Sequence, residues 1–96
     1  MIAPLKPKAF PLGQVVATPG ALAAIEAAGQ SPMEFIIRHV RNDWGEVCAD
    51  DWALNDESLD SGDRLLSAYR TAKGERIWVI TESSRDVTTL LLPDDY

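Results

Sequence analysis

The chain has 96 residues, of which 15 are acidic and 9 are Lys or Arg, so its formal net charge is −6. This length suits a single domain, and no apolar run approaches the roughly 20 residues that span a bilayer. The one cysteine, Cys48, excludes an internal disulfide and fits a reducing compartment. Because the N-terminus also lacks the apolar core of a signal peptide, we expect a cytoplasmic protein without membrane contact.

The N-terminal segment is rich in proline. Residues 1–11 contain three prolines and two lysines, which predicts a flexible, extended arm. A single domain then spans residues 12–96. It begins with a short strand candidate at residues 13–17, which we expect to lie at an edge of a sheet.

Two helices with marked starting points follow. Thr18 can cap the first helix, whose first residue is a proline, and Gly29 closes it. Ser31 and Glu34 form a capping box at the start of the second helix, which we expect to end at Gly45. One apolar stripe of the second helix is predicted to face the sheet. The stripe comprises Met33, Ile36, Ile37, Val40 and Trp44.

The only histidine, His39, lies off this stripe on the second helix. Asp43 follows it by one helical turn, so the pair is either a general base oriented by a carboxylate or an ordinary surface ion pair. Cys48 is interpreted as a small buried residue. One cysteine and one histidine do not make a zinc site, so we expect neither a metal nor a cofactor.

Residues 42–63 contain eight acidic side chains and no Lys or Arg. A third helix is predicted here, with Asp50 as its N-cap and an end near Asp60. Asn55 lies on its apolar side and needs a hydrogen-bond partner if it is buried. The run is either a solvated helix face or a surface that docks on a basic partner, and it disfavours direct nucleic-acid binding. The candidate partner-binding residues are Asp50, Asp51, Asp56, Glu57 and Asp60.

The last third holds three apolar, β-rich runs separated by polar turns, and Pro93 ends the last run. The predicted strands comprise residues 65–69, 77–81 and 87–92. The middle run is apolar on both faces, which predicts a strand buried on each side with Trp78 as a major core residue. The predicted fold class is α+β: a short N-terminal strand, about three helices and a three-stranded antiparallel meander, with the helices packed on one face of the sheet.

Several short motifs occur in a fixed order along the chain. They are Thr18-Pro19-Gly20-Ala21-Leu22, Arg38-His39-Val40 with Asp43-Trp44-Gly45, Asn55, Ser67-Ala68-Tyr69, Trp78-Val79-Ile80-Thr81-Glu82 and Thr88-Thr89-Leu90-Leu91-Leu92-Pro93 through Tyr96. Over roughly residues 10–96 this set resembles a family of small bacterial proteins from plasmids, integrated elements and prophages, described as plasmid-related. The family brings no activity that can be assigned to particular residues.

The first functional hypothesis is a non-enzymatic accessory protein of a mobile element, which binds a protein partner through its acidic surface. An anti-defence inhibitor or a nucleic-acid mimic is its sharpest form. The alternative is a small ribonuclease or toxin-like enzyme, because the element order is similar to that of RelE-like and barnase-like ribonucleases. His39 would then be the general base, Asp43 its orienting group, and Arg64 or Arg70 the phosphate clamp. A homodimer through residues 87–92 or another edge strand is a third hypothesis.

Overall fold

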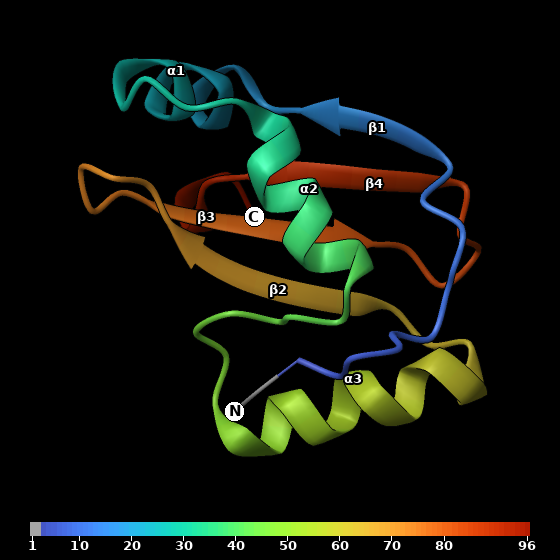
Figure 1. The fold of residues 1–96 in the computed structure, drawn as a ribbon. Helices are drawn as coiled ribbons and strands as arrows, with labels where there is room; N and C mark the ends of the chain where they lie inside the picture. Colours follow the sequence, from blue (N-terminus) through green and yellow to red (C-terminus); the bar gives the residue numbers. More distant parts are fainter. Residues whose placement is uncertain (1–2) are drawn as a thin grey trace.

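The computed structural model describes residues 3–96, which form three α-helices and a four-stranded sheet (Figure 1). The helices are α1 (Pro19–Ala27), α2 (Pro32–Val40) and α3 (Ala49–Ser61). The strands are β1 (Gln14–Ala17), β2 (Leu65–Arg70), β3 (Arg76–Thr81) and β4 (Val87–Leu91), and a 3-10 turn (Pro93–Asp95) follows them. The α+β class is therefore confirmed. No helix of residues 3–96 combines the length and the apolar character needed to cross a membrane.

The sheet is mixed, with strand order β1-β4-β3-β2. β2, β3 and β4 are antiparallel neighbours, whereas β1 pairs in parallel with β4, with Gln14 beside Val87 and Ala17 beside Leu90. The predicted three-stranded antiparallel meander is therefore only part of the sheet, because β1 joins it as a fourth, parallel strand. β1 occupies an edge and β4 is internal. The proposed dimer contact through residues 87–92 was therefore wrong, whereas a dimer through another edge strand stays a prediction.

The predicted starts of α1 and α2 are confirmed by their side-chain caps. The backbone N–H of Ala21 donates to the Thr18 hydroxyl at 3.2 Å. Ser31 and Glu34 form the predicted capping box, with the Ser31 N–H donating to the Glu34 carboxylate at 3.2 Å. These caps involve residues two or three apart in the sequence, so they could be recognised without any tertiary information.

The buried face of α2 differs from the predicted stripe. Met33 and Ile37 are 55% and 42% exposed, whereas Phe35, Ile36 and His39 are buried. The helix also ends at Val40 rather than at Gly45, because Asn42 adopts a left-handed backbone with φ of 61°. The predicted stripe is thus confirmed for Ile36, Val40 and Trp44, which are buried or packed against the core, and was wrong for Met33 and Ile37.

The main core lies where the chain's first two helices meet one face of the sheet. Figure 1 shows α2 crossing this face, and the buried core residues from both layers are Ala21, Ile25, Phe35, Ile36, Tyr69, Ile77, Val79 and Leu90. Trp78 lies on the opposite face, half-buried, with its ring 5.8 Å from that of Tyr96. The prediction that Trp78 is a major core residue was therefore wrong, and the fully buried tryptophan is Trp44. The predicted burial of β3 on both faces is confirmed at Ile80, which shares the face of Trp78 and is 4% exposed.

α3 lies beside β2 rather than over the centre of the sheet (Figure 1). The Asn55 side chain donates to the Leu66 carbonyl at 2.7 Å and accepts from the Leu66 N–H at 3.1 Å. Two residues further along β2, the Ala68 N–H donates to the Trp44 carbonyl at 3.1 Å. The predicted need of Asn55 for a partner is confirmed, and these contacts occupy the outer edge of β2.

The segment before β1 makes defined contacts with the domain. The Lys8 N–H donates to the Asn42 side chain at 2.7 Å, and the Asn42 amide donates back to the Lys8 carbonyl at 3.2 Å. Phe10 packs against the cluster around Trp44. Flexibility of residues 1–11 stays a prediction, and the first two of these residues lie outside the described part of the chain.

Candidate functional site

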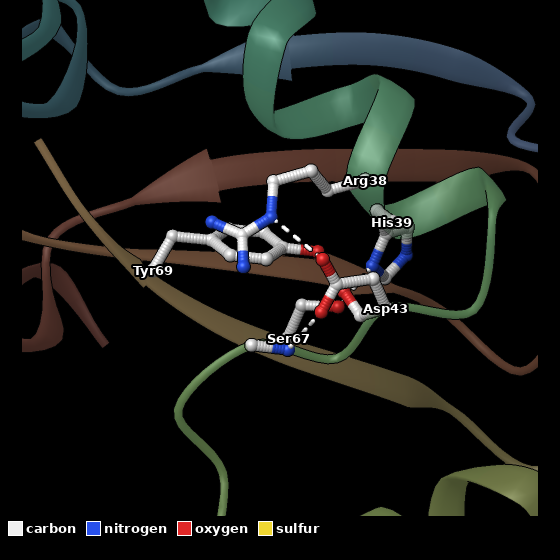
Figure 2. Close-up of polar contacts among 6 residues, drawn as sticks. Arg38, His39, Asp43, Ser67 and Tyr69 are labelled. Atoms are coloured by element: carbon white, nitrogen blue, oxygen red, sulfur yellow. Dashed lines mark hydrogen bonds and ion pairs between the residues drawn. The ribbon is translucent and has the colours of Figure 1, made fainter. Parts of the chain in front are cut away.

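His39 is buried between α2 and the sheet, with 0% of its surface exposed (Figure 2). Its Nδ1 lies 2.5 Å from the Ser67 hydroxyl and its Nε2 lies 2.9 Å from the Thr81 hydroxyl. The rings of Phe10 and Trp44 meet it at steep angles, with centroids 5.4 Å and 5.5 Å away. The interpretation of His39 as a surface ion-pair residue was therefore wrong.

The hydrogen bonds around His39 have a single consistent direction. The Leu12 carbonyl can only accept, so the Thr88 hydroxyl donates its one proton there at 2.7 Å. Thr81 must then donate to Thr88 at 2.8 Å, which leaves the Thr81 oxygen to accept from Nε2–H of His39. This chain of hydrogen bonds therefore places a proton on Nε2. In a neutral ring with that proton, Nδ1 accepts from the Ser67 hydroxyl.

The electrostatic surroundings keep the ring neutral. Burial, followed by the positive charge of Arg85, lowers the pKa of His39 from 6.5 to about 3. Every buried side-chain nitrogen and oxygen of residues 3–96 has a hydrogen-bond partner. His39 therefore acts as a structural link between α2, β3 and, through Thr81 and Thr88, the segment that precedes β1.

Asp43 does not pair with His39 as predicted but with other groups (Figure 2). Its carboxylate accepts from Arg38 Nε at 2.8 Å and from the Gly45 N–H at 3.1 Å. The Arg38 guanidinium lies over the Tyr69 ring, 4.5 Å from its centroid, and the Tyr69 hydroxyl donates to the Asp43 carbonyl at 2.7 Å. Burial raises the pKa of this phenol, so it stays protonated. These contacts fix the loop that follows α2.

The two candidate phosphate-binding arginines lie elsewhere. Arg70 forms an exposed ion pair with Glu46, with Nε and Oε1 2.8 Å apart. Arg64 donates to the Tyr96 hydroxyl at 2.5 Å, with its guanidinium 5.5 Å from the centre of that ring. The structure therefore does not bring these side chains together with the buried His39. Within the described residues, no group of three or more His, Cys, Asp or Glu side chains could hold a metal ion.

The five predicted partner-binding acids are all exposed on α3, and we call them the acidic α3 surface. Two of them have intramolecular partners: the Asp56 carboxylate accepts from the Trp44 indole N–H at 3.0 Å, and Asp60 forms an ion pair with Lys8. The residues of the acidic α3 surface are Asp50, Asp51, Asp56, Glu57 and Asp60. Within residues 3–96, Asp50, Asp51 and Glu57 make no ion pair or side-chain hydrogen bond.

The start of α3 corrects two predictions. Its N-cap is Cys48 rather than Asp50, so both acids at the start of α3 lie in the first turn, where they interact favourably with the helix dipole. The Cys48 thiol is exposed, so its interpretation as a buried residue was wrong.

An open groove of about 560 Å³ is lined by α3, β2 and the turn after β3. α3 contributes residues at helical spacing, including Asp51, Leu54 and Ser58, and the opposite wall includes Leu66 and Glu82. Sequence reasoning missed this groove. The spacing of its α3 residues was visible in the sequence, but the opposite wall comes from strands whose position depends on the fold.

Arg85 holds the end of α3 against the turn between β3 and β4. One guanidinium nitrogen donates to the carbonyls of Asp63 and Glu82, at 2.7 Å and 3.1 Å, and another donates to the Ser58 carbonyl at 3.0 Å. A planar guanidinium can reach three carbonyls at once, whereas a lysine ammonium cannot reproduce this geometry. Nothing in the local sequence distinguished Arg85 from an exposed turn residue.

No known protein family, curated protein or solved structure matches this chain. The resemblance to plasmid-related proteins therefore stays a prediction. A functional proposal rests on the contacts, exposure and charge of the chain's own residues.

Proposed function

We propose that this chain is a non-enzymatic binding protein whose acidic α3 surface holds a basic protein partner. It would act as an accessory protein of a mobile element. The most specific version of this proposal is an anti-defence inhibitor or nucleic-acid mimic. The observation that carries the proposal is the charge of α3. This helix has five exposed carboxylates and no Lys or Arg.

The cost of this charge supports a binding role. Acids in the first turn of a helix are favoured by the helix dipole, whereas Asp60 in the last turn is disfavoured by it and is already paired with Lys8. Like charges on one helix also repel each other. A basic partner would relieve this repulsion, and complementary charge speeds association.

The attachment of α3 further favours binding. Asn55 and Arg85 fix the helix to β2 and to the turn after β3, so its acidic side chains lie on a preformed surface. A preformed surface loses less conformational entropy on binding than a flexible segment does. The ribonuclease alternative has no comparable support, because the His39 ring has no exposed surface from which to reach a substrate.

The choice of substitutions follows from the contacts of the acidic α3 surface. Asp56 accepts from the Trp44 indole and Asp60 pairs with Lys8, so changing either one also disturbs the fold. Charge reversal is therefore confined to carboxylates without such contacts.

The test compares two double variants that change the net charge equally. Asp51→Lys with Glu57→Lys alters the acidic α3 surface, whereas Glu26→Lys with Glu75→Lys alters exposed acids elsewhere. Each protein is immobilised, and proteins retained from a bacterial lysate are quantified by mass spectrometry. We expect a basic partner that the wild type and the control retain and the α3 variant loses. Retention by the α3 variant, or equal loss from both variants, would contradict the proposal.

A further inference from the structure

The groove beside α3 has walls that are fixed by hydrogen bonds on both sides. Asn55 ties the middle of α3 to β2, and Arg85 ties its end to the turn after β3. The groove therefore exists before any ligand arrives. Its volume of about 560 Å³ falls within the range of roughly 300–1,000 Å³ that is typical of ligand sites.

The lining of the groove combines apolar surface with negative charge. Leu54 is 58% exposed and faces a groove that Leu66 lines from the sheet. The acidic residues Asp51, Asp63 and Glu82 also line it. Within residues 3–96, Asp51 and Glu82 make no ion pair or side-chain hydrogen bond, so their charge is available to a ligand.

Arg64 is the one cation among the lining residues, and its guanidinium is already bound to the Tyr96 hydroxyl. The Arg85 guanidinium also lies against the groove, where it donates to the carbonyls of three lining residues. The groove therefore has three acidic residues against two arginines, and both arginines already have intramolecular partners. Such a site repels phosphate and attracts Lys or Arg. The exposed leucine adds a requirement for apolar contact.

We propose that this groove binds a short segment of the partner in which Arg or Lys stands next to an apolar side chain. The inference rests on the proposed function, to which it adds a binding site for the partner and a preference for the sequence bound there. The cationic side chain contacts Asp51 and Glu82, while the apolar side chain covers Leu54 and Leu66. Charge attracts the segment, and apolar burial selects it among other basic segments.

Three capped tripeptides test the preference: Arg-Leu-Arg, Arg-Ser-Arg and Glu-Leu-Glu. Each is titrated into the full ¹⁵N-labelled chain, and backbone amide shifts are followed by NMR. We expect saturable shifts of Leu54, Leu66 and Ser83 with the first peptide. The serine peptide should bind about tenfold more weakly, because it lacks the apolar side chain, and the acidic peptide should not bind. Equal binding of both basic peptides, shifts confined to another surface, or no saturable shift would overturn the proposal.

A matched pair of variants separates this inference from the proposed function. Leu54→Gln removes the exposed apolar side chain of the groove, and Leu22→Gln makes the same change at an exposed leucine of α1. We expect only Leu54→Gln to abolish the leucine preference and to weaken partner capture. If Leu54→Gln still captures the partner fully while the α3 charge variant does not, the groove is excluded and the acidic α3 surface is retained.

Discussion

At the scale of single residues, His39 shows how a polar group can serve as a core residue. Its two ring nitrogens have one hydroxyl partner each, and aromatic rings cover it on two sides. Burial lowers the pKa of the imidazole to about 3. A pKa this low leaves the ring neutral at physiological pH, so Nδ1 accepts from Ser67 while Nε2–H donates to Thr81.

The protonation state of His39 can be measured without ambiguity, because the chain has no other histidine. We expect its ring resonances in NMR spectra to show no titration between pH 8 and about pH 4, since its pKa lies near 3. The ¹⁵N shifts should report a protonated Nε2 and an unprotonated Nδ1. A midpoint near 6.5, or the opposite tautomer, would show that the ring is solvated or bonded differently.

The same pKa shift makes stability depend on pH. The folded value of about 3 lies below the unfolded value of 6.5, so between them the unfolded chain binds a proton that the folded chain does not. The free energy of unfolding therefore decreases as the pH falls from 6.5, by at most about 1.4 kcal/mol per pH unit. Urea unfolding at pH 7 and 5.5 measures this slope, which His39→Gln should largely remove. A slope that persists in the variant would assign the effect to other groups.

At the scale of elements, features with local sequence signals could be predicted, whereas features set by tertiary contacts could not. The caps of α1 and α2 and the positions of β2, β3 and β4 were found because their signals lie within a few residues. The buried face of α2 was misplaced, since the direction of His39 is set by Ser67 and Thr81, which are 28 and 42 residues away. The pairing of β1 with β4 is also long-range, and no local pattern reports it.

The attachment of α3 to β2 depends on Asn55. Asn55→Ala leaves the backbone N–H and carbonyl of Leu66 without their side-chain partner, and we expect a loss of about 1–3 kcal/mol in the free energy of unfolding. Hydrogen exchange at the Leu66 amide should accelerate more than exchange in β3. Glu57→Ala on the same helix is the control, since an exposed substitution changes stability by at most about 0.5 kcal/mol. Equal effects of the two substitutions would show that Asn55 does not anchor the helix.

At the scale of the whole molecule, the main core and the exposed acidic residues lie in different parts of the fold. The main core lies between the sheet and the first two helices, whereas α3 stands beside β2 and carries the exposed acids. The sequence was sufficient to locate this acidic run, because charge is read residue by residue. It could not reveal the groove, because residues from α3, β2 and the turn after β3 meet there only in the fold.

Hydrogen exchange of the free chain and of its complex with the captured partner maps the binding surface without any substitution. We expect slower exchange on binding at the first turn of α3, where the amides of Asp50 and Asp51 have no helical acceptor, and at Ser83 beside the groove. Exchange in β1 and around Trp78 should stay unchanged. Protection at the outer edge of β1 or around Trp78, with α3 unaffected, would contradict a binding role for the acidic α3 surface.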